Sequence, residues 1–179
     1  MPIFHSNIKS HQNGFTLVEL LVAIGVLLLL LGVGIANYLD FNDRQQLVQA
    51  AQLVREAFAD AQNSARTGKL GGCEALHAYR VSSLAGVGGV RVTARCRTPG
   101  GVIDGESRDF VWQGSTTHDS FSPIYISPVQ GLFYADENQM DGVELASAPP
   151  FEIVLTHDSY TVMVSLSRLG AVTVGEIES

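Results

Sequence analysis

The sequence predicts an α+β protein in which one long N-terminal helix packs on a C-terminal antiparallel β domain. Three observations predict this class. An apolar run covers residues 15–36, an amphipathic helical pattern follows over residues 37–67, and strand patterns fill residues 68–179. Because no proline occurs between Pro2 and Pro99, a single helix can continue through the first two of these segments.

The apolar run is long enough to cross a bilayer. As an α-helix, residues 15–36 would extend about 33 Å, at about 1.5 Å per residue, against a hydrocarbon core of about 30 Å. Glu19 is its only charged residue. A carboxylate inside a membrane helix costs roughly 2.5–3.5 kcal/mol on insertion scales and by default marks a site with a partner. We therefore predict that the first half of the helix spans a membrane and that Glu19 is a site with a partner.

The amphipathic segment predicts a helix that continues onto the globular domain. Apolar residues recur at steps of three and four, opposite a polar face. The expected buried stripe consists of Leu47, Ala50, Ala51, Val54, Ala57, Phe58, Ala61 and Ala65. Gly68 is suited to cap the C-terminus of the helix. We expect one helix from about Gly14 to about Thr67, with its second half packed on the β domain.

The region after the helix predicts two small antiparallel sheets. The expected strands are His77–Ser82, Val90–Cys96, Arg108–Gln113, Ser127–Tyr134, Phe151–Thr156, Tyr160–Ser167 and Ala171–Glu176. The segment from Ser167 to Gly170 is predicted to form a hairpin turn. The expected loops are Leu84–Gly89, Thr98–Gly105, Gly114–Pro123 and Ala135–Pro150.

The stretch Gly14-Phe15-Thr16-Leu17-Val18-Glu19, followed by a hydrophobic helix, resembles the processing site of type IV prepilins and type II secretion pseudopilins. The resemblance covers residues 1 to about 67. It implies that prepilin peptidase cleaves between Gly14 and Phe15 and that Phe15 is then N-methylated. It also implies that Glu19 pairs with the amino terminus of a neighbouring subunit during assembly. A cation and an anion that are each costly in lipid offset one another when paired.

The resemblance implies a structural filament subunit without enzymatic activity or cofactor. Residues 1–14 would be the leader and residues 15–36 the membrane and filament-core helix. The implied partners are other pilin subunits, prepilin peptidase, the inner-membrane assembly platform and, before assembly, membrane lipid. The helix–β order with a C-terminal hairpin resembles the minor, H-type pseudopilins in pattern, which favours a minor subunit.

The implied location is the inner membrane, which the chain would cross once before it enters a periplasmic or extracellular filament. Lys9 is the only formal charge before the apolar run, and Asp40 and Asp43 follow it. This bias places the N-terminus in the cytoplasm. The region 68–179 would then be extracytoplasmic, where Cys73 and Cys96 can form a disulfide. Two unrelated buried thiols are the alternative, and the absence of a CxxC pattern argues against a zinc or redox site.

One segment has the oxygen ligands that calcium prefers. Residues Asp136–Glu144 include Asp136, Asn138 and Asp141, but an extra residue before Asp141 breaks the EF-hand register. A solvated acidic turn is the alternative, and no metal ligand is assigned.

A short repeat contains Ser, His and Asp. Thr117-His118-Asp119-Ser120-Phe121 recurs as Thr156-His157-Asp158-Ser159-Tyr160. Catalytic triads are assembled from separated chain positions, so neighbouring Ser, His and Asp residues do not predict one. We expect similar turns at strand ends rather than catalysis.

Two other functions compete with the filament interpretation. Arg91, Arg95 and Arg97 share one face of a predicted strand, as in a DNA-binding minor pilin for DNA uptake. The net charge of -7 argues against nucleic acid as the main partner. The second rival is a membrane-anchored extracellular binding module or enzyme, which would leave the chain uncleaved after Gly14.

Overall fold

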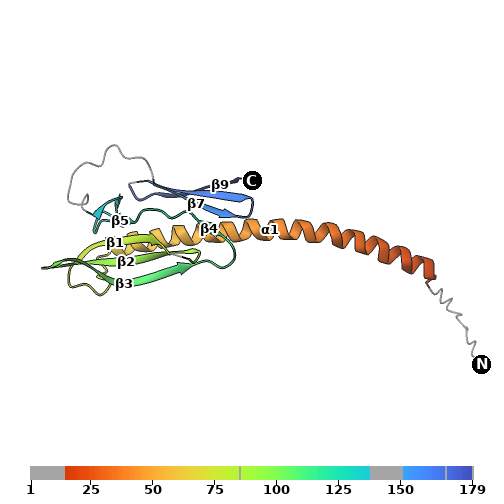
Figure 1. The fold of residues 1–179 in the computed structure, drawn as a ribbon, viewed down its shortest axis with the longest axis horizontal. Helices are drawn as coiled ribbons and strands as arrows, with labels where there is room; N and C mark the ends of the chain where they lie inside the picture. The colour runs from red at the N-terminus through yellow and green to blue at the C-terminus, as the bar shows by residue number, and fades with distance from the viewer. Residues whose placement is uncertain (1–14, 85, 138–150, 168, 179) are drawn as a thin grey trace, which may run out of the picture. The chain divides into compact units, whose positions relative to one another are not determined.

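The computed structural model describes residues 15–84, 86–137, 151–167 and 169–178, with residues 33–37 described by their backbone alone. In this part of the chain one helix, α1 (Leu17–Arg66), precedes nine strands (Figure 1). The chain divides into two compact units, Met1–Asp40 and Phe41–Ser179. Within the described residues, no helix combines the length and the apolar character that crossing a membrane requires.

Both ends of α1 have local causes. The helix was expected from about Gly14, but it begins at Leu17 because Thr16 occupies the N-cap position. At the other end Gly68 has a φ of +67°. The N–H of Lys69 donates to the carbonyl of Ser64 at 2.9 Å, and that of Gly68 to Ala65 at 3.3 Å. These two hydrogen bonds form a Schellman motif. Gly68 therefore caps the C-terminus of the helix, as the sequence predicted.

The second unit contains two antiparallel sheets. The five-stranded sheet has the order β3-β2-β1-β5-β6 and the four-stranded sheet the order β4-β7-β8-β9. The strands are β1 (Leu76–Ser83), β2 (Gly89–Thr98), β3 (Gly101–Val111), β4 (Thr117–His118), β5 (Ile124–Ile126), β6 (Phe133–Tyr134), β7 (Phe151–His157), β8 (Tyr160–Leu166) and β9 (Val172–Glu178). The predicted α+β class is confirmed.

The core of this unit forms between the predicted apolar stripe of α1 and both sheets. All eight stripe residues are at most 1% exposed. Phe58 contacts the five-stranded sheet, where its ring centroid lies 5.6 Å from that of Phe133. In the four-stranded sheet, Ile153 and Leu155 of β7 alternate with more exposed neighbours, as expected for strands with one buried face.

The predicted loop Thr98–Gly105 is wrong. Strand β3 begins at Gly101. Its pairing with β2 extends from the facing residues Thr98 and Gly101 to the facing residues Gly89 and Val111. The Thr98 hydroxyl donates to the Gly101 carbonyl at 2.7 Å across the tight turn. Because most of β3 is exposed, its sequence lacks the apolar alternation on which the prediction relied.

The predicted single strand Ser127–Tyr134 is also wrong. Residues 127–132 are the turn of a hairpin between β5 and β6, in which Ile126 pairs with Phe133, and only Phe133–Tyr134 of the predicted strand are in a strand. Pro128 cannot donate to a strand ladder, and Val129 has a φ of +70° that no strand accommodates. The predicted loop Gly114–Pro123 contains the two-residue strand β4.

The predicted C-terminal hairpin is confirmed. The N–H of Ser167 donates to the Ala171 carbonyl at 2.8 Å, and β8 and β9 pair on either side. Strand β9 begins and ends slightly later than predicted, at Val172 and Glu178.

Candidate functional site

The N-terminus of α1 is closed by a reciprocal set of hydrogen bonds between Thr16 and Glu19. The backbone N–H and the hydroxyl of Thr16 each donate to Glu19 Oε2 at 3.0 Å. In return the backbone N–H of Glu19 donates to Thr16 Oγ1 at 3.3 Å. This is a capping box, which satisfies two amides that the first helical turn leaves without carbonyl partners. It also places a carboxylate at the positive end of the helix dipole.

The side chains around this carboxylate form an exposed apolar surface. Phe15 is 88% exposed and Leu17 77%, and most of the large apolar side chains of the following turns are similarly accessible. A contiguous apolar surface of this kind marks an interaction site. The described site therefore consists of one acidic group on an apolar helix. It offers a partner for a cation and a surface for other apolar helices.

The comparisons agree with this site. Residues 9–35 match the family described as the prokaryotic N-terminal methylation motif, which defines the class of the N-terminal segment. The match supports recognition of the chain as a type IV prepilin or pseudopilin, as the sequence indicated. It spans Gly14, Phe15 and Glu19, whose individual roles stay predictions. Gly14 lies outside the described residues. Comparisons with curated proteins and with solved structures found no significant match.

The predicted disulfide is present. Cys73 and Cys96 are bonded, with their Cα atoms 5.1 Å apart, and both side chains are buried. The bond ties the segment after α1 to strand β2. A Cβ at Gly105 would lie 2.8 Å from the Cys96 sulfur and 2.7 Å from the Gly71 carbonyl oxygen, so only glycine fits beside the disulfide.

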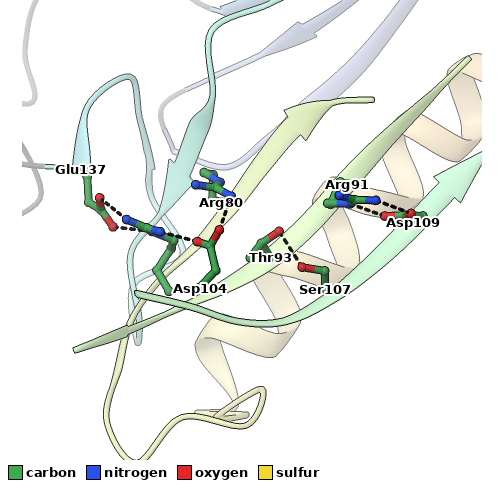
Figure 2. Close-up of polar contacts among 8 residues, drawn as sticks. Arg80, Arg91, Thr93, Asp104, Ser107, Asp109 and Glu137 are labelled. Atoms are coloured by element: carbon green, nitrogen blue, oxygen red, sulfur yellow. Dashed lines mark hydrogen bonds and ion pairs between the residues drawn. The ribbon is translucent and has the colours of Figure 1, made fainter. Parts of the chain in front are cut away.

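The predicted arginine stripe on β2 is matched by carboxylates. Figure 2 shows Arg91 against Asp109 of β3, where two hydrogen bonds of 2.6 and 2.8 Å form a fork. Arg95 makes a similar fork with Glu137, at 2.8 and 2.9 Å, and also contacts Asp104. Arg80 donates to Asp104 at 2.9 Å.

These contacts change the acidity of the carboxyl groups on β3. The hydrogen bonds from Arg91 lower the pKa of Asp109. Burial acts to raise the pKa of Asp104, but hydrogen bonds and charge from Arg95 and Arg80 outweigh it, and this pKa too is lowered. Both carboxylates are therefore held ionised.

The ion pairs weaken the case for DNA binding. A DNA phosphate would have to displace Asp109 from Arg91, and Glu137 and Asp104 from Arg95. The third arginine of the stripe, Arg97, lies 2.9 Å from His77 Nδ1. The sequence did not reveal these pairs because Asp104 was assigned to a loop, no pairing was predicted between the expected strand Arg108–Gln113 and β2, and Glu137 is 42 residues from Arg95.

Only the first two residues of the acidic segment Asp136–Glu144 lie in the described part of the chain. Asp136 and Glu137 are described, and Glu137 is bound to Arg95. The other proposed ligands, Asn138 and Asp141, lie outside the described residues, as does Glu144. Calcium binding stays the alternative to a solvated acidic turn that the sequence left open.

The two copies of the short repeat lie on neighbouring strands, where Thr117 of β4 pairs with Thr156 of β7. Their histidines have different surroundings. His118 packs edge-on against Trp112, with ring centroids 5.3 Å apart, and burial lowers its pKa despite the nearby charge of Asp119. His157 is 2% exposed, and its partners Thr116 and Asp43 lie outside its own copy of the repeat.

Proposed function

We propose that this protein is a structural subunit of a type IV pilus or a type II secretion pseudopilus. It is made as a prepilin whose apolar helix, residues 15–36, spans the inner membrane once, with the N-terminus in the cytoplasm. Prepilin peptidase removes residues 1–14, and the new terminus at Phe15 is methylated. The subunit then leaves the membrane and joins the filament through its helix. The helix–β layout with a C-terminal hairpin favours a minor subunit.

One observation carries this proposal. The helix begins with an apolar, exposed surface whose single acidic group, Glu19, lies one turn from the predicted new terminus at Phe15. In the isolated chain this carboxylate accepts hydrogen bonds from Thr16. An amine of a neighbouring subunit would add a charged partner to the same oxygen atoms. Pairing of this kind sets the axial position of one apolar helix against the next.

The test uses two substitutions of Glu19. Gln can accept the same hydrogen bonds at this position of a capping box but carries no charge. Ala removes both the hydrogen-bond acceptor and the charge. If pairing with an amine is the role, Glu19→Gln and Glu19→Ala should be processed normally and should both fail to enter filaments. Cell fractionation and immunoblotting of sheared filaments measure this. Normal incorporation of Glu19→Gln would reduce the role of Glu19 to capping.

Processing is tested separately on the mature protein. Intact-mass and N-terminal peptide measurements should show a chain that begins at a methylated Phe15. A product that still begins at Met1 would instead favour the rival membrane-anchored module. The described residues include no observation that favours the DNA-binding rival, since its arginines are engaged with carboxylates or with His77.

A further inference from the structure

Three potential metal ligands meet where the β7–β8 turn approaches α1. Asp43, His157 and Asp158 can each present one donor atom, and these atoms all lie within 4.8 Å of one another. Asp43 lies on the helix, 114 residues before His157. This distance in sequence explains why no metal ligand was predicted. The cluster is separate from Glu19 and from the matched N-terminal motif.

Each residue is held by its own element. His157 is the last residue of β7, is 2% exposed, and pairs with Tyr160 across the two-residue turn. Asp158 is exposed and has a φ of +49°, a left-handed conformation that Asp adopts more readily than most residues. The Asp43 side chain is 27% exposed. A buried nitrogen therefore faces two carboxylates that solvent ions can reach.

The separation of two of the three ligand atoms matches that of two ligands on one metal ion. His157 Nε2 lies 3.4 Å from Asp43 Oδ1. Charge-assisted N–H to carboxylate bonds are shorter, at about 2.7–2.9 Å. Two ligand atoms that are each about 2.0–2.1 Å from a tetrahedral Zn²⁺ ion lie about 3.3–3.4 Å from one another.

The other ring nitrogen has the contact that metal-binding histidines commonly make. His157 Nδ1 lies 2.9 Å from the hydroxyl oxygen of Thr116, which is itself 2% exposed. When Nδ1–H donates to this oxygen, the lone pair of the imidazole is on Nε2, toward Asp43. Outer contacts of this type orient the ring and select the tautomer that binds a metal.

The neighbouring cation is directed at an aromatic ring. Arg44 follows Asp43 on α1, and its guanidinium carbon lies 4.7 Å from the centroid of the Tyr160 ring. One of its nitrogen atoms donates to the Tyr160 hydroxyl at 3.3 Å. The carboxylates of Asp43 and Asp158 and the imidazole of His157 lie beside this residue and supply the ligand atoms.

We propose that Asp43, His157 and Asp158 bind one divalent transition-metal ion, with Zn²⁺ as the best chemical fit. One imidazole nitrogen and two carboxylate oxygens supply three ligands, and water supplies the fourth. The bound ion joins α1 to the β7–β8 hairpin and stabilises the second unit by an amount that rises with the logarithm of the free Zn²⁺ concentration once this exceeds the Kd. The proposal does not depend on the filament function.

Isothermal titration of the full-length protein in detergent with ZnCl₂ tests the site. We expect saturable binding that includes one site lost on substitution of Asp158, and a thermal midpoint that rises with Zn²⁺ and falls back with a chelator. Mg²⁺ at the same concentration should not replace Zn²⁺, because it prefers six oxygen ligands. A chain that binds no Zn²⁺ overturns the proposal.

A matched pair of substitutions assigns the binding to this cluster. Asp158→Asn keeps the turn conformation, because Asn also tolerates a positive φ, and removes one charged ligand. Asp119→Asn changes the equivalent residue of the other repeat, outside the cluster. We expect Asp158→Asn to weaken binding at this site by at least about tenfold and Asp119→Asn to leave it unchanged. Equal affinity in the two variants would place the zinc elsewhere and overturn the assignment.

Discussion

The Arg95 guanidinium and the Glu137 carboxylate form a two-bond fork, at 2.8 and 2.9 Å, that joins strand β2 to the segment after β6. The two side chains are only 14% and 18% exposed. Screening by water is therefore weaker for this pair than for a pair on the open surface. Asp104 contacts the same arginine, so one cation connects three parts of the five-stranded sheet and its loops.

Substitution of Glu137 should reduce stability. Glu137→Gln leaves Arg95 with one carboxylate partner instead of two, and we expect the free energy of unfolding to fall by about 1–3 kcal/mol. Chemical denaturation followed by circular dichroism measures the change. Glu74→Gln is the control, because Glu74 is exposed, and it should stay within about 0.5 kcal/mol of the unsubstituted protein. Equal stability of the two variants would show that the fork contributes nothing.

The paired carboxyl groups predict a loss of stability in acid. The pKa values of Asp104 and Asp109 are lowered in the folded state. Such groups stabilise the fold above the unfolded-state pKa of about 3.9, and their contribution disappears as the pH falls through the folded-state values. Below about pH 4 the thermal midpoint should therefore drop. Asp109→Asn should make the drop shallower, and parallel profiles for the two proteins would contradict this assignment.

The cap at the start of α1 predicts a local effect. Thr16→Val removes the hydroxyl that both donates to Glu19 and accepts from it. We expect a cost of about 0.5–2 kcal/mol, confined to the first turn. Hydrogen exchange of the purified protein in detergent should show faster exchange at the first helical amides. Thr16→Ser keeps the hydroxyl and should restore slow exchange, a result that loss of side-chain bulk alone does not explain.

Loss of the disulfide should destabilise the β domain. Cys73→Ser removes a bond between residues 23 positions apart, and removal of a native disulfide typically costs about 2–5 kcal/mol. The variant with both cysteines replaced should unfold at the same temperature as the single variant. Dithiothreitol should lower the midpoint of the unsubstituted protein and leave the double variant unchanged. An unsubstituted protein that is insensitive to reduction would argue against this contribution.

A methyl group beside the disulfide should also be costly. Gly105→Ala would place a carbon within 2.8 Å of the Cys96 sulfur, and overpacking of this kind costs about 1–3 kcal/mol. Gly100→Ala is the matched control, because a Cβ there meets nothing within 4 Å. Thermal unfolding should separate the two variants. Similar midpoints would mean that the chain around Gly105 relaxes without loss.

The success of the sequence predictions depended on whether a pattern was local. The helical stripe from Leu47 to Ala65 was predicted residue by residue, because burial on one face of a helix imposes a period that short segments reveal. The first part of strand β3, residues 101–105, was missed because none of it is buried and its Asp104 contacts Arg95 on β2, so it lacks an apolar alternation. The disulfide was predicted because the chain has only two cysteines.

The candidate sites also differ in whether their residues lie close together in the sequence. Thr16 and Glu19 lie three positions apart, so the capping arrangement was accessible from the sequence, although only the charge of Glu19 was recognised there. The contact between Asp43 and His157 depends on the fold of the whole second unit. No spacing in the sequence relates these two residues, so their contact could not be predicted from it. The ion pair between Arg95 and Glu137 was hidden for the same reason.

The stripe that α1 buries is made largely of alanine, including Ala50, Ala57 and Ala61. Alanine has no side-chain rotamers to lose when it packs and none to regain when it is disturbed. Packing this helical segment on the strands therefore costs almost no side-chain conformational entropy at the alanine positions, and the entropic cost falls mainly on Leu47, Val54 and Phe58.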